Sequence, residues 1–447
     1  MTKYKAYPEY KDSGVEWLGE IPADWEMLRH KYVASFTKGR NPISLFEQSL
    51  KNTLPYLSME CLRNNITDKY ALISNDIRIA VEGQPLIIWD GSNAGEFVKG
   101  KSGILSSTMA AATLIFPLNP QYYWYLCITI EPEMRKSAIG MGIPHVNGDE
   151  LKNISFGIPS IHEQKKISSF LDHETAKIDN LIETQQQLIE LLKEKRQAVI
   201  SHAVTKGLNP DVPMKDSGVE WLGEVPGHWE FVPLKYLCNF SGGGTPTKDN
   251  LSYWQEGTVP WVSPKDMKSF WISETQDYVT PKAVSESSTN YVDEGSLLMV
   301  VRSGILQRNI PVAINIVKVT MNQDMKALKF NERMKAHYAA YFINGNVNSL
   351  LLEWTKEGAT VESIEHEYLA NGLLPVPPID EQYSIIKSIS NQMIRFELLE
   401  EKALTGIQLL QERRTALISA AVTGKIDVRD WVAPDSQETD KTEETTA

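Results

Sequence analysis

The sequence predicts a mixed α/β protein built from one module used twice. Two internal repeats predict the duplication. The stretch that begins at Lys11 recurs from Lys215, at an offset of 204, and all but three of its positions are identical. Chance cannot plausibly produce such a match. A second repeat, at an offset of 218, opens two segments of equal length in which apolar residues have helical spacing. The chain is therefore ordered as short repeat, variable segment and long helix, followed by the same three parts again.

The two repeats also show where the copies differ. The first repeat reads KDSGVEWLGEIPADWE at 11–26 and KDSGVEWLGEVPGHWE at 215–230. The second has the pattern Pro-x-Ile-x-Glu-Gln and lies at 159–164 and 377–382. Because the offset grows from 204 to 218 between the repeats, the second variable segment is longer than the first by that difference. The helical segments that follow have one length.

The segments after the second repeat are expected to be long helices. Apolar residues recur in one row of each segment, namely Leu171, Ile178, Leu192 and Val199, then Ile389, Phe396, Ala403, Leu410 and Leu417. Prolines upstream, and Gly207 and Gly424 downstream, are start and stop signals. A helix of about 43 residues is about 65 Å long. Each helix packing on its own domain is an alternative, but the matched lengths favour packing of the two helices on each other.

The variable segments 27–157 and 231–375 are expected to be α/β domains. Short β-rich runs such as 297–301 alternate with Gly, Pro and Asn turn signals, and helical patterns follow near 121–134 and 332–352. Each segment has a usual domain size. The two sequences differ greatly although their flanks match, which suggests one framework that presents two different specificities.

These observations divide the chain into seven parts. The parts are an N-terminal short repeat (1–26), a first variable domain (27–157), a central long helix (158–207), a second short repeat (208–230), a second variable domain (231–375), a C-terminal long helix (376–426) and an acidic tail (427–447). The tail is expected to be disordered, because from about Ala433 it is low in complexity and lacks apolar residues to bury.

Composition indicates the compartment. Three widely spaced cysteines, Cys61, Cys127 and Cys238, argue against a disulfide framework and against a thiolate zinc site. The N-terminus has no signal-like apolar region and no apolar run is long enough for a membrane span, so a cytoplasmic, reduced protein is expected. The net charge is −12, yet basic and acidic side chains nearly balance within each of the two variable domains. Charge therefore neither supports nor excludes binding of nucleic acid through local patches.

Patterns typical of catalysis are weak. The stretch from Gly95 to Ser102 satisfies the phosphate-loop pattern, but turn residues precede it and a poor helix start follows. A flexible loop whose Lys99 and Lys101 contact DNA phosphate is the preferred interpretation, and a nucleotide-dependent enzyme stays open as an alternative. The sequence lacks a zinc-binding His pattern, the Asn-Pro-Pro-aromatic loop that clamps a flipped adenine and a glycine fingerprint for S-adenosylmethionine. No catalytic residue and no metal site is predicted.

The remaining polar loops carry side chains of the kinds that contact DNA. Glycines allow close approach of backbone to phosphate, and Arg, Asn and Gln can pair with base edges. In the first variable domain the candidates are Lys38, Arg40, Arg63, Asn64, Lys99, Lys101, His145 and Asn147. In the second they are Gly243, Thr245, Thr247, Lys248, Trp261, Lys265, Asp266, Arg302, Gln307, Arg308 and Asn309. Each residue alone is equally well explained by an ordinary polar turn, so the prediction concerns the group.

Over nearly its whole length the chain resembles the specificity subunit of type I restriction–modification systems. The resemblance is carried by the doubled short repeat, by Gly-Gly-Thr-Pro at 243–246, by Asn-Gln-Asp at 322–324 and by the proline-rich stretch ending in Glu-Gln at 375–382. The first variable domain departs from the pattern, because Phe-Thr-Lys-Gly-Arg at 36–40 stands where the glycine-rich stretch belongs.

The resemblance implies a fold of the α+β/mixed class. Two α/β target-recognition domains would be separated by two long antiparallel coiled-coil helices, in a pseudo-two-fold duplicated architecture. Each domain would read one half of a bipartite double-stranded DNA site, while the helices set the spacing and dock two methyltransferase (modification) subunits and restriction (motor) subunits.

The same resemblance assigns the chemistry to other chains. S-adenosylmethionine, ATP and Mg²⁺ are expected on the partner subunits and no cofactor is expected on this chain, which would be a non-catalytic specificity subunit. A duplicated coiled-coil interaction protein without DNA affinity stays open as an alternative.

Overall fold

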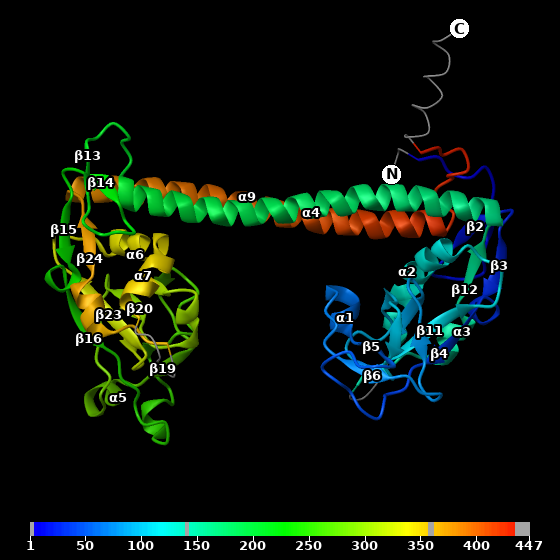
Figure 1. Ribbon diagram of the computed structural model, residues 1–447, viewed down its shortest axis with the longest axis horizontal. Helices are drawn as coiled ribbons and strands as arrows, with labels where there is room; N and C mark the ends of the chain where they lie inside the picture. Colours follow the sequence, from blue (N-terminus) through cyan, green and yellow to red (C-terminus); the bar gives the residue numbers. More distant parts are fainter. Residues whose placement is uncertain (1–3, 139–142, 356–361, 434–447) are drawn as a thin grey trace, which may run out of the picture. The chain divides into compact units, whose positions relative to one another are not determined.

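The computed structural model describes residues 4–138, 143–355 and 362–433 (Figure 1). The chain divides into two compact units, the first formed by Met1–Gln185 with Thr405–Ala447 and the second by Gln186–Leu404. Both boundaries fall inside long helices. Each unit therefore contains one short repeat, one variable domain and a part of each long helix.

The first variable domain contains two four-stranded sheets. In one, the strand order is β4-β11-β8-β9, formed by Ala34–Lys38, Met109–Leu114, Pro85–Ile88 and Phe97–Lys99. In the other it is β6-β5-β10-β7, formed by Tyr70–Leu72, Thr53–Leu57, Gly103–Leu105 and Ile79–Ala80. The helices are α1 (Met59–Asn64), α2 (Pro120–Ser137) and α3 (Gly148–Asn153), and β12 (Ser155–Ile158) pairs with β3 (Glu26–Arg29). The buried face of α2 forms one hydrophobic core with the first sheet and the adjacent long helix.

The second variable domain repeats this plan with changes. Its larger sheet has the order β16-β23-β20-β21-β18, formed by Cys238–Gly242, Met325–Phe330, Leu297–Val300, Val312–Asn315 and Trp271–Ile272. The smaller sheet is β19-β17-β22, formed by Asp277–Val279, Val259–Val262 and Thr320–Met321. The helices are α5 (Pro281–Glu286), α6 (Ala336–Gly345), α7 (Val347–Trp354) and α8 (His366–Asn371), and β15 (Glu230–Pro233) pairs with β24 (Leu373–Val376).

Equivalent glutamines explain why both copies keep Glu-Gln at the start of the long helix. Gln164 accepts a hydrogen bond from the backbone N–H of Asn119 at 2.9 Å, and Gln382 accepts one from the backbone N–H of Lys335 at 2.9 Å. Asn119 and Lys335 immediately precede α2 and α6. Both amide groups also donate to a backbone carbonyl at the start of their own long helix, at 2.9 Å. Each glutamine thus links a variable domain to a long helix. Its amide group can be buried because both of its polar atoms have hydrogen-bond partners.

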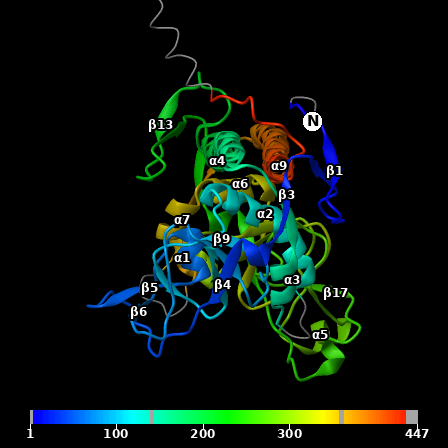
Figure 2. The same cartoon turned by 90° about the vertical axis from the view of Figure 1, so that its right-hand side faces the viewer.

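The long helices are α4 (Ile161–Lys206) and α9 (Ile379–Val422). Within the first unit they run antiparallel: Arg414 contacts Asp179 at 2.8 Å, and Lys166 contacts the backbone of Trp431, beyond the end of α9. Figure 2, in which the first unit faces the viewer, shows the two helices side by side. They are antiparallel in the second unit as well: Arg196 lies 3.7 Å from Glu397, and residues 200–204, later in α4, share a core with residues 385–393, earlier in α9. Apolar residues from both helices enter the hydrophobic core of each unit.

The short repeats form hairpins at helix ends. In the first, β1 (Tyr10–Asp12) pairs with β2 (Glu20–Pro22), and in the second β13 (Met214–Asp216) pairs with β14 (Glu224–Pro226). Lys425 donates to the carbonyl oxygen of Glu20 at 2.7 Å, and Lys206 donates to the equivalent carbonyl of Glu224. Each hairpin therefore holds the residues at the end of one long helix.

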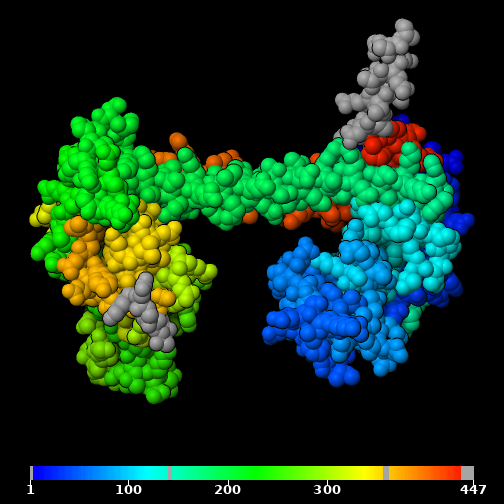
Figure 3. Space-filling model, in the orientation of Figure 1, coloured from blue at the N-terminus to red at the C-terminus, as the bar shows by residue number. Residues whose placement is uncertain are grey.

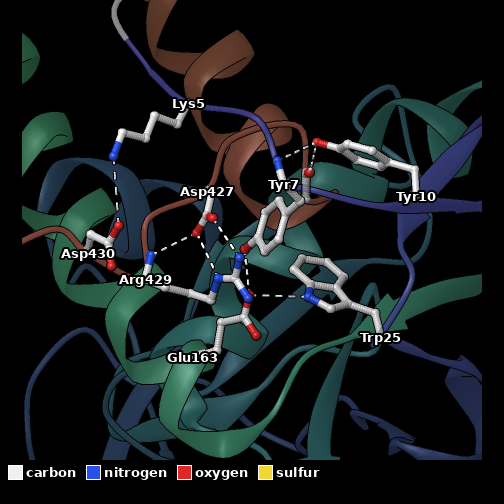
Figure 4. Close-up of polar contacts among 9 residues, drawn as sticks. Lys5, Tyr7, Tyr10, Trp25, Glu163, Asp427, Arg429 and Asp430 are labelled. Carbon is white, nitrogen blue, oxygen red and sulfur yellow. Dashed lines mark hydrogen bonds and ion pairs between the residues drawn. The ribbon is translucent and has the colours of Figure 1, made fainter.

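Glu163 is the centre of a polar clasp in the first unit (Figure 4). Its carboxylate accepts hydrogen bonds from the Tyr7 hydroxyl at 2.5 Å and from the Trp25 indole at 3.2 Å. The guanidinium of Arg429 lies 4.8 Å from the centre of the Tyr7 ring and is bound by Asp427 at 2.7 Å. The clasp joins the start of α4 to segments from both ends of the described chain.

The clasp corrects one prediction. The sequence predicts a disordered tail over 427–447, yet Val428 is buried, the N–H of Asp427 donates to the carbonyl of Lys5 at 2.8 Å, and the ring of Trp431 packs on Phe170. The acidic composition of the tail concealed two apolar residues that can be buried. Residues 434–447, the rest of the predicted tail, lie outside the described residues.

The three cysteines are free and buried, as expected for a chain without a disulfide framework. No helix within the described ranges is long and apolar enough to cross a membrane.

Candidate nucleic-acid interface

In the first variable domain, most of the candidate cations already have partners. Lys38 pairs with Asp90 at 2.7 Å, and Arg63 pairs with Glu96. The ammonium of Lys101 donates to the carbonyl of Cys61, and that of Lys99 lies 5.3 Å from the centre of the Trp124 ring. Lys38, Arg63 and Lys101 would bind phosphate only by exchanging these contacts, whereas the contact of Lys99 with an aromatic ring leaves its N–H groups without a protein acceptor in the part of the chain that the structure describes. Surface ion pairs of this kind contribute little stability, so the four residues remain candidates.

The other candidates of this domain have two kinds of environment. The side chain of Asn147 accepts hydrogen bonds from Asp149 and Glu150 and so caps the N-terminus of α3. Arg40, Asn64 and His145 are exposed, and no hydrogen bond or ion pair engages their side chains among the described residues. The structure thus leaves these three side chains available to a ligand.

The phosphate-loop pattern from Gly95 to Ser102 is not followed by a helix. Strand β9 lies within the pattern, and β10 begins at Gly103 directly after it. Gly95 has a φ of +92°, and a Cβ there would lie 2.8 Å from the backbone nitrogen of Arg135. The glycine is explained by this turn and close packing. A helix N-terminus that could cradle phosphate does not follow, so the geometry does not support the nucleotide-binding alternative.

In the second variable domain, the glycine-rich stretch packs against the turn at 322–324. A Cβ at Gly243 would lie 1.8 Å from the carbonyl oxygen of Asn322, and one at Gly244 would lie 2.6 Å from that of Ser288. The Thr245 hydroxyl hydrogen-bonds to Gln323. These glycines allow backbone to meet backbone of the same domain. The packing brings together two of the motifs that carry the family resemblance.

The same turn holds Arg302. Its guanidinium donates from Nε to Oδ1 of Asp324 at 2.8 Å and from Nη2 at 2.7 Å. Asn322 supports Asp324 by donating to Oδ2 at 3.2 Å and by accepting from its backbone N–H at 3.1 Å. Arg302 remains about half exposed, with a side-chain accessibility of 53%. Its guanidinium is therefore oriented by the turn while one side still faces solvent.

The remaining candidates separate into structural and exposed residues. Asp266 accepts from the backbone N–H groups of Ser263 and Gln276, each at 2.8 Å, so it stabilises a turn. The exposed residues, for which no side-chain hydrogen bond or ion pair occurs among the described residues, are Lys248, Lys265, Gln307, Arg308 and Asn309. Three of them follow one another at the end of a short 3₁₀ helix, Gly304–Gln307. This is the densest group of available polar side chains among the predicted residues of this domain.

A small cavity contains two candidates and two residues that the sequence did not single out. The cavity has a volume of about 280 Å³ and is lined by Lys248, Trp254, Trp261 and Asp277. The indole N–H of Trp261 donates to the carbonyl of Gly244 at 3.0 Å, and that of Trp254 donates to the carbonyl of Thr247 at 3.2 Å. Asp277 reaches the cavity because it is the antiparallel partner of Trp261 across β17 and β19. That register joins two separate strands, which no local pattern indicates.

Two grooves lie along the long helices, one in each unit, and the repeat relates them. The groove of the first unit lies between α2 and α9 and measures about 500 Å³, and that of the second lies beside α4 and measures about 850 Å³. Five positions of the long helices line both grooves, because they are related by the offset of 218. In α4 they are Lys193, Glu194, Gln197, Ala198 and Ser201, and in α9 they are Gln411, Glu412, Thr415, Ala416 and Ser419. In the space-filling view, the yellow α6–α7 region lies directly against the green end of α4 (Figure 3).

Exposed leucines on the long helices follow the repeat too. Leu181 and Leu409 belong to the first unit, Leu399 and Leu191 are their equivalents in the second, and these residues are 45–60% exposed. Exposed apolar residues thus recur at equivalent positions of the two units.

Comparison with known proteins gives one consistent family. The model described as "Type I restriction modification DNA specificity domain" matches residues 22–194 and 226–408. The type I restriction enzyme MjaVIII specificity subunit of Methanocaldococcus jannaschii is 28% identical over 426 residues, 92% of this chain and 94% of that protein. The EcoR124I/EcoR124II specificity subunit of Escherichia coli is 35% identical over 195 residues, 43% of this chain and 44% of that protein.

Solved structures agree on the fold. A chain from a study of complex assembly and conformational transition of the type I R-M system has a TM-score of 0.63 at 16% identity, over 90% of this chain and 98% of that one. The HsdS subunit from Thermoanaerobacter tengcongensis has a TM-score of 0.51 at 15% identity, over 91% and 98%. The predicted class, with two mixed α/β domains and two long helices, is confirmed. Since the family model matches most of the sequence in two segments, the chain belongs to the family of the type I restriction modification DNA specificity domain, which it contains twice.

Proposed function

We propose that this chain is the DNA specificity subunit of a type I restriction–modification complex, in which each variable domain reads one half of a bipartite site. The observation that carries the proposal is a duplicated scaffold with divergent domains. The short repeats are nearly identical, whereas the variable segments differ in length and greatly in sequence. One scaffold that presents two unlike surfaces suits two unlike half-sites.

Exposed polar side chains support DNA contact in both domains. Arg40, Asn64 and His145 in the first domain, and the run from Gln307 to Asn309 in the second, face solvent without a partner among the described residues. Phosphate contacts would position each domain, and base-edge contacts would give sequence specificity. The residues of these loops differ between the domains, so the two half-sites are expected to differ as well.

The long helices are proposed to set the spacing between half-sites and to bind the modification subunits. Support comes from the two repeat-related grooves and from the exposed leucines at repeat-equivalent positions, namely Leu181 with Leu399 and Leu191 with Leu409. Because each unit carries a groove and exposed leucines at equivalent positions, one modification subunit would bind to each unit. Restriction subunits would join this assembly, and S-adenosylmethionine, ATP and Mg²⁺ would be bound by the partners while this chain performs no catalysis.

Co-expression with a modification subunit tests partner and DNA binding together. The expected product is a complex with two modification subunits per chain, whose affinity for double-stranded target DNA falls as salt rises. If the purified chain binds no modification subunit and shows no salt-sensitive DNA binding, the result would instead favour the alternative of a duplicated coiled-coil interaction protein. ATP binding by the purified chain would favour the nucleotide-dependent enzyme.

An insertion tests the spacing role. Four added residues between Gln185 and Gln187 of α4 lengthen the helix by about 6 Å, and the preferred gap between half-sites should lengthen with it. The matched control is a four-residue insertion after Pro210, in the exposed connection that follows α4. A selection from a library of duplexes with varied gaps reads out both variants, and an unchanged gap preference in the helix variant would exclude the spacing role.

A further inference from the structure

We propose that the cavity lined by Lys248, Trp254, Trp261 and Asp277 is a binding pocket for a single unstacked DNA base and its phosphate. The inference rests on the proposed function, because it takes the second variable domain to bind DNA, and it adds a ligand class and a place. About 280 Å³ is just below the range of roughly 300–1,000 Å³ that small-molecule pockets span. The space suits one small planar group.

The two tryptophans give the cavity fixed aromatic walls. Their ring centres are 5.1 Å apart and their planes meet at 86°, so one ring meets the other edge-on. Both indole N–H groups already donate to backbone carbonyls of the 244–247 loop, which fixes the ring planes. Trp261 is buried, at 6% exposed, and packs in a small core with Val259, Val279 and Ala283, whereas Trp254 is half-buried. A ring held in place and partly open is a platform on which a base can stack.

The charged residues supply complementary chemistry at the rim. Lys248 and Asp277 are exposed, and no hydrogen bond or ion pair engages the side chain of either residue within the described ranges. An ammonium group attracts phosphate, and a carboxylate accepts hydrogen bonds from the exocyclic amino group of cytosine, adenine or guanine. Thymine has no such amino group. The pocket should therefore bind thymine least well of the four bases.

The location connects the pocket to the family motif. The loop that accepts both indole hydrogen bonds includes Gly244 and Thr247, and Gly244 also donates its backbone N–H to the carbonyl of Met321 at 2.8 Å. The glycine-rich stretch thus positions the tryptophans through its carbonyl groups. This gives the stretch a role in shaping a binding pocket, in place of direct contact with phosphate.

The test uses the complex with modification subunits and duplexes that carry one bulged 2-aminopurine, compared with the fully paired duplex. Stacking on an indole should quench the 2-aminopurine. Trp254→Ala should weaken binding of the bulged duplex by about 5- to 150-fold, the range found for one stacked base. Trp271→Ala, which removes an exposed tryptophan of the same unit outside the pocket, is the matched control and should change nothing. Asp277→Asn changes an exposed side chain without loss of volume and should reduce the discrimination against thymine when the bulged base is varied.

Each outcome decides the proposal. If bulged and paired duplexes bind equally, and the pocket variants match the control, the pocket proposal is wrong while salt-sensitive binding of paired DNA still supports the proposed function. If free nucleoside monophosphates bind in a way that Trp254→Ala abolishes but the bulged duplex gains nothing, the ligand is a free nucleotide and the assignment to DNA is wrong. If even the paired duplex does not bind, the proposed function itself fails.

Discussion

Arg414 of α9 donates from Nε to Oδ1 of Asp179 of α4 at 2.8 Å, and the sequence repeat contains this pair twice. Asp179 and Arg196 recur at the offset of 218 as Glu397 and Arg414. In the second unit, Arg196 of α4 lies 3.7 Å from Glu397 of α9, so the helix that supplies the acid in one unit supplies the base in the other. Antiparallel packing of two copies of one helix produces this exchange.

The first prediction concerns that pair. Both side chains are a third to a half exposed, so Arg414→Ala should lower the free energy of unfolding by less than about 1 kcal/mol. Arg414→Asp should cost more, because two carboxylates then face each other, and adding Asp179→Arg should recover the difference. A double-mutant cycle by denaturant unfolding measures the coupling. A double variant no more stable than Arg414→Asp alone would mean that the pair makes no energetic contribution.

Two repeat-equivalent tryptophans should respond differently to loss of the indole N–H. Trp25 and Trp229 are fully buried, but only Trp25 has a hydrogen-bond partner among the described residues, the buried carboxylate of Glu163. Trp25→Phe should therefore cost about 1–3 kcal/mol more than Trp229→Phe, because it removes a hydrogen bond to a buried carboxylate, which then keeps the bond from Tyr7. Hydrogen exchange followed by mass spectrometry reports on each unit separately. Equal costs would show that the Glu163 contact adds nothing.

Neighbouring glycines offer a matched test of the packing at 322–324. Gly243→Ala should distort the loop, because its Cβ would lie 1.8 Å from the carbonyl oxygen of Asn322, whereas nothing lies within 4 Å of a Cβ at Gly242. We expect the first variant to lose stability and DNA binding through the second domain, and Gly242→Ala to behave as the native chain. Thermal unfolding and a duplex-binding assay measure both. If the two variants behave alike, Gly243 is not required for this packing.

Acid should destabilise the first unit through His30. Burial lowers the pKa of this histidine to about 4, and its Nδ1 donates to the carbonyl of Leu151 at 3.1 Å while Nε2 accepts from the Tyr123 hydroxyl at 2.8 Å. Between about pH 6.5 and 4 the unfolded chain binds a proton that the folded chain does not, so the free energy of unfolding should fall as the pH falls through this window. The full effect is on the order of 3 kcal/mol.

The measurement is the unfolding free energy as a function of pH for the native chain and for His30→Phe. The variant should lose the part of the acid sensitivity that lies between pH 6.5 and 4, whereas His162→Ala, at an exposed histidine, should keep it. An unchanged pH profile in His30→Phe would mean that other groups cause the loss of stability.

Two arginines near the 3₁₀ helix should differ in their effect on DNA binding. Arg308 is exposed without a partner among the described residues, and Arg308→Ala should weaken specific binding by about 1–3 kcal/mol if it contacts a base bidentately. Arg302→Ala should weaken binding and also loosen the loop, because Arg302 is bound to Asp324. Binding isotherms with hydrogen exchange of the loop separate the two effects. Unchanged affinity in both variants would place these residues in the scaffold.

The sequence alone determined the architecture, because duplication and periodicity are properties of residue order. The offsets of 204 and 218 located the repeats, and the apolar rows predicted helices that the structure shows as Ile161–Lys206 and Ile379–Val422. The family followed from the same motifs. Each of these inferences compares residues along the chain and needs no knowledge of which side chains meet.

Only the tertiary structure decided which polar residues are available, because hydrogen-bond partners are supplied by distant segments. Lys101 is bound by the carbonyl of Cys61 and Arg302 by Asp324, although both belong to loops that look free in the sequence. Asp277 joins Trp261 through a strand register, and Val428 is buried although its neighbours are charged. The sequence shows which side chains are able to hydrogen-bond or pair with a ligand. The packing of the strands and helices determines which of those side chains remain without a partner in the protein.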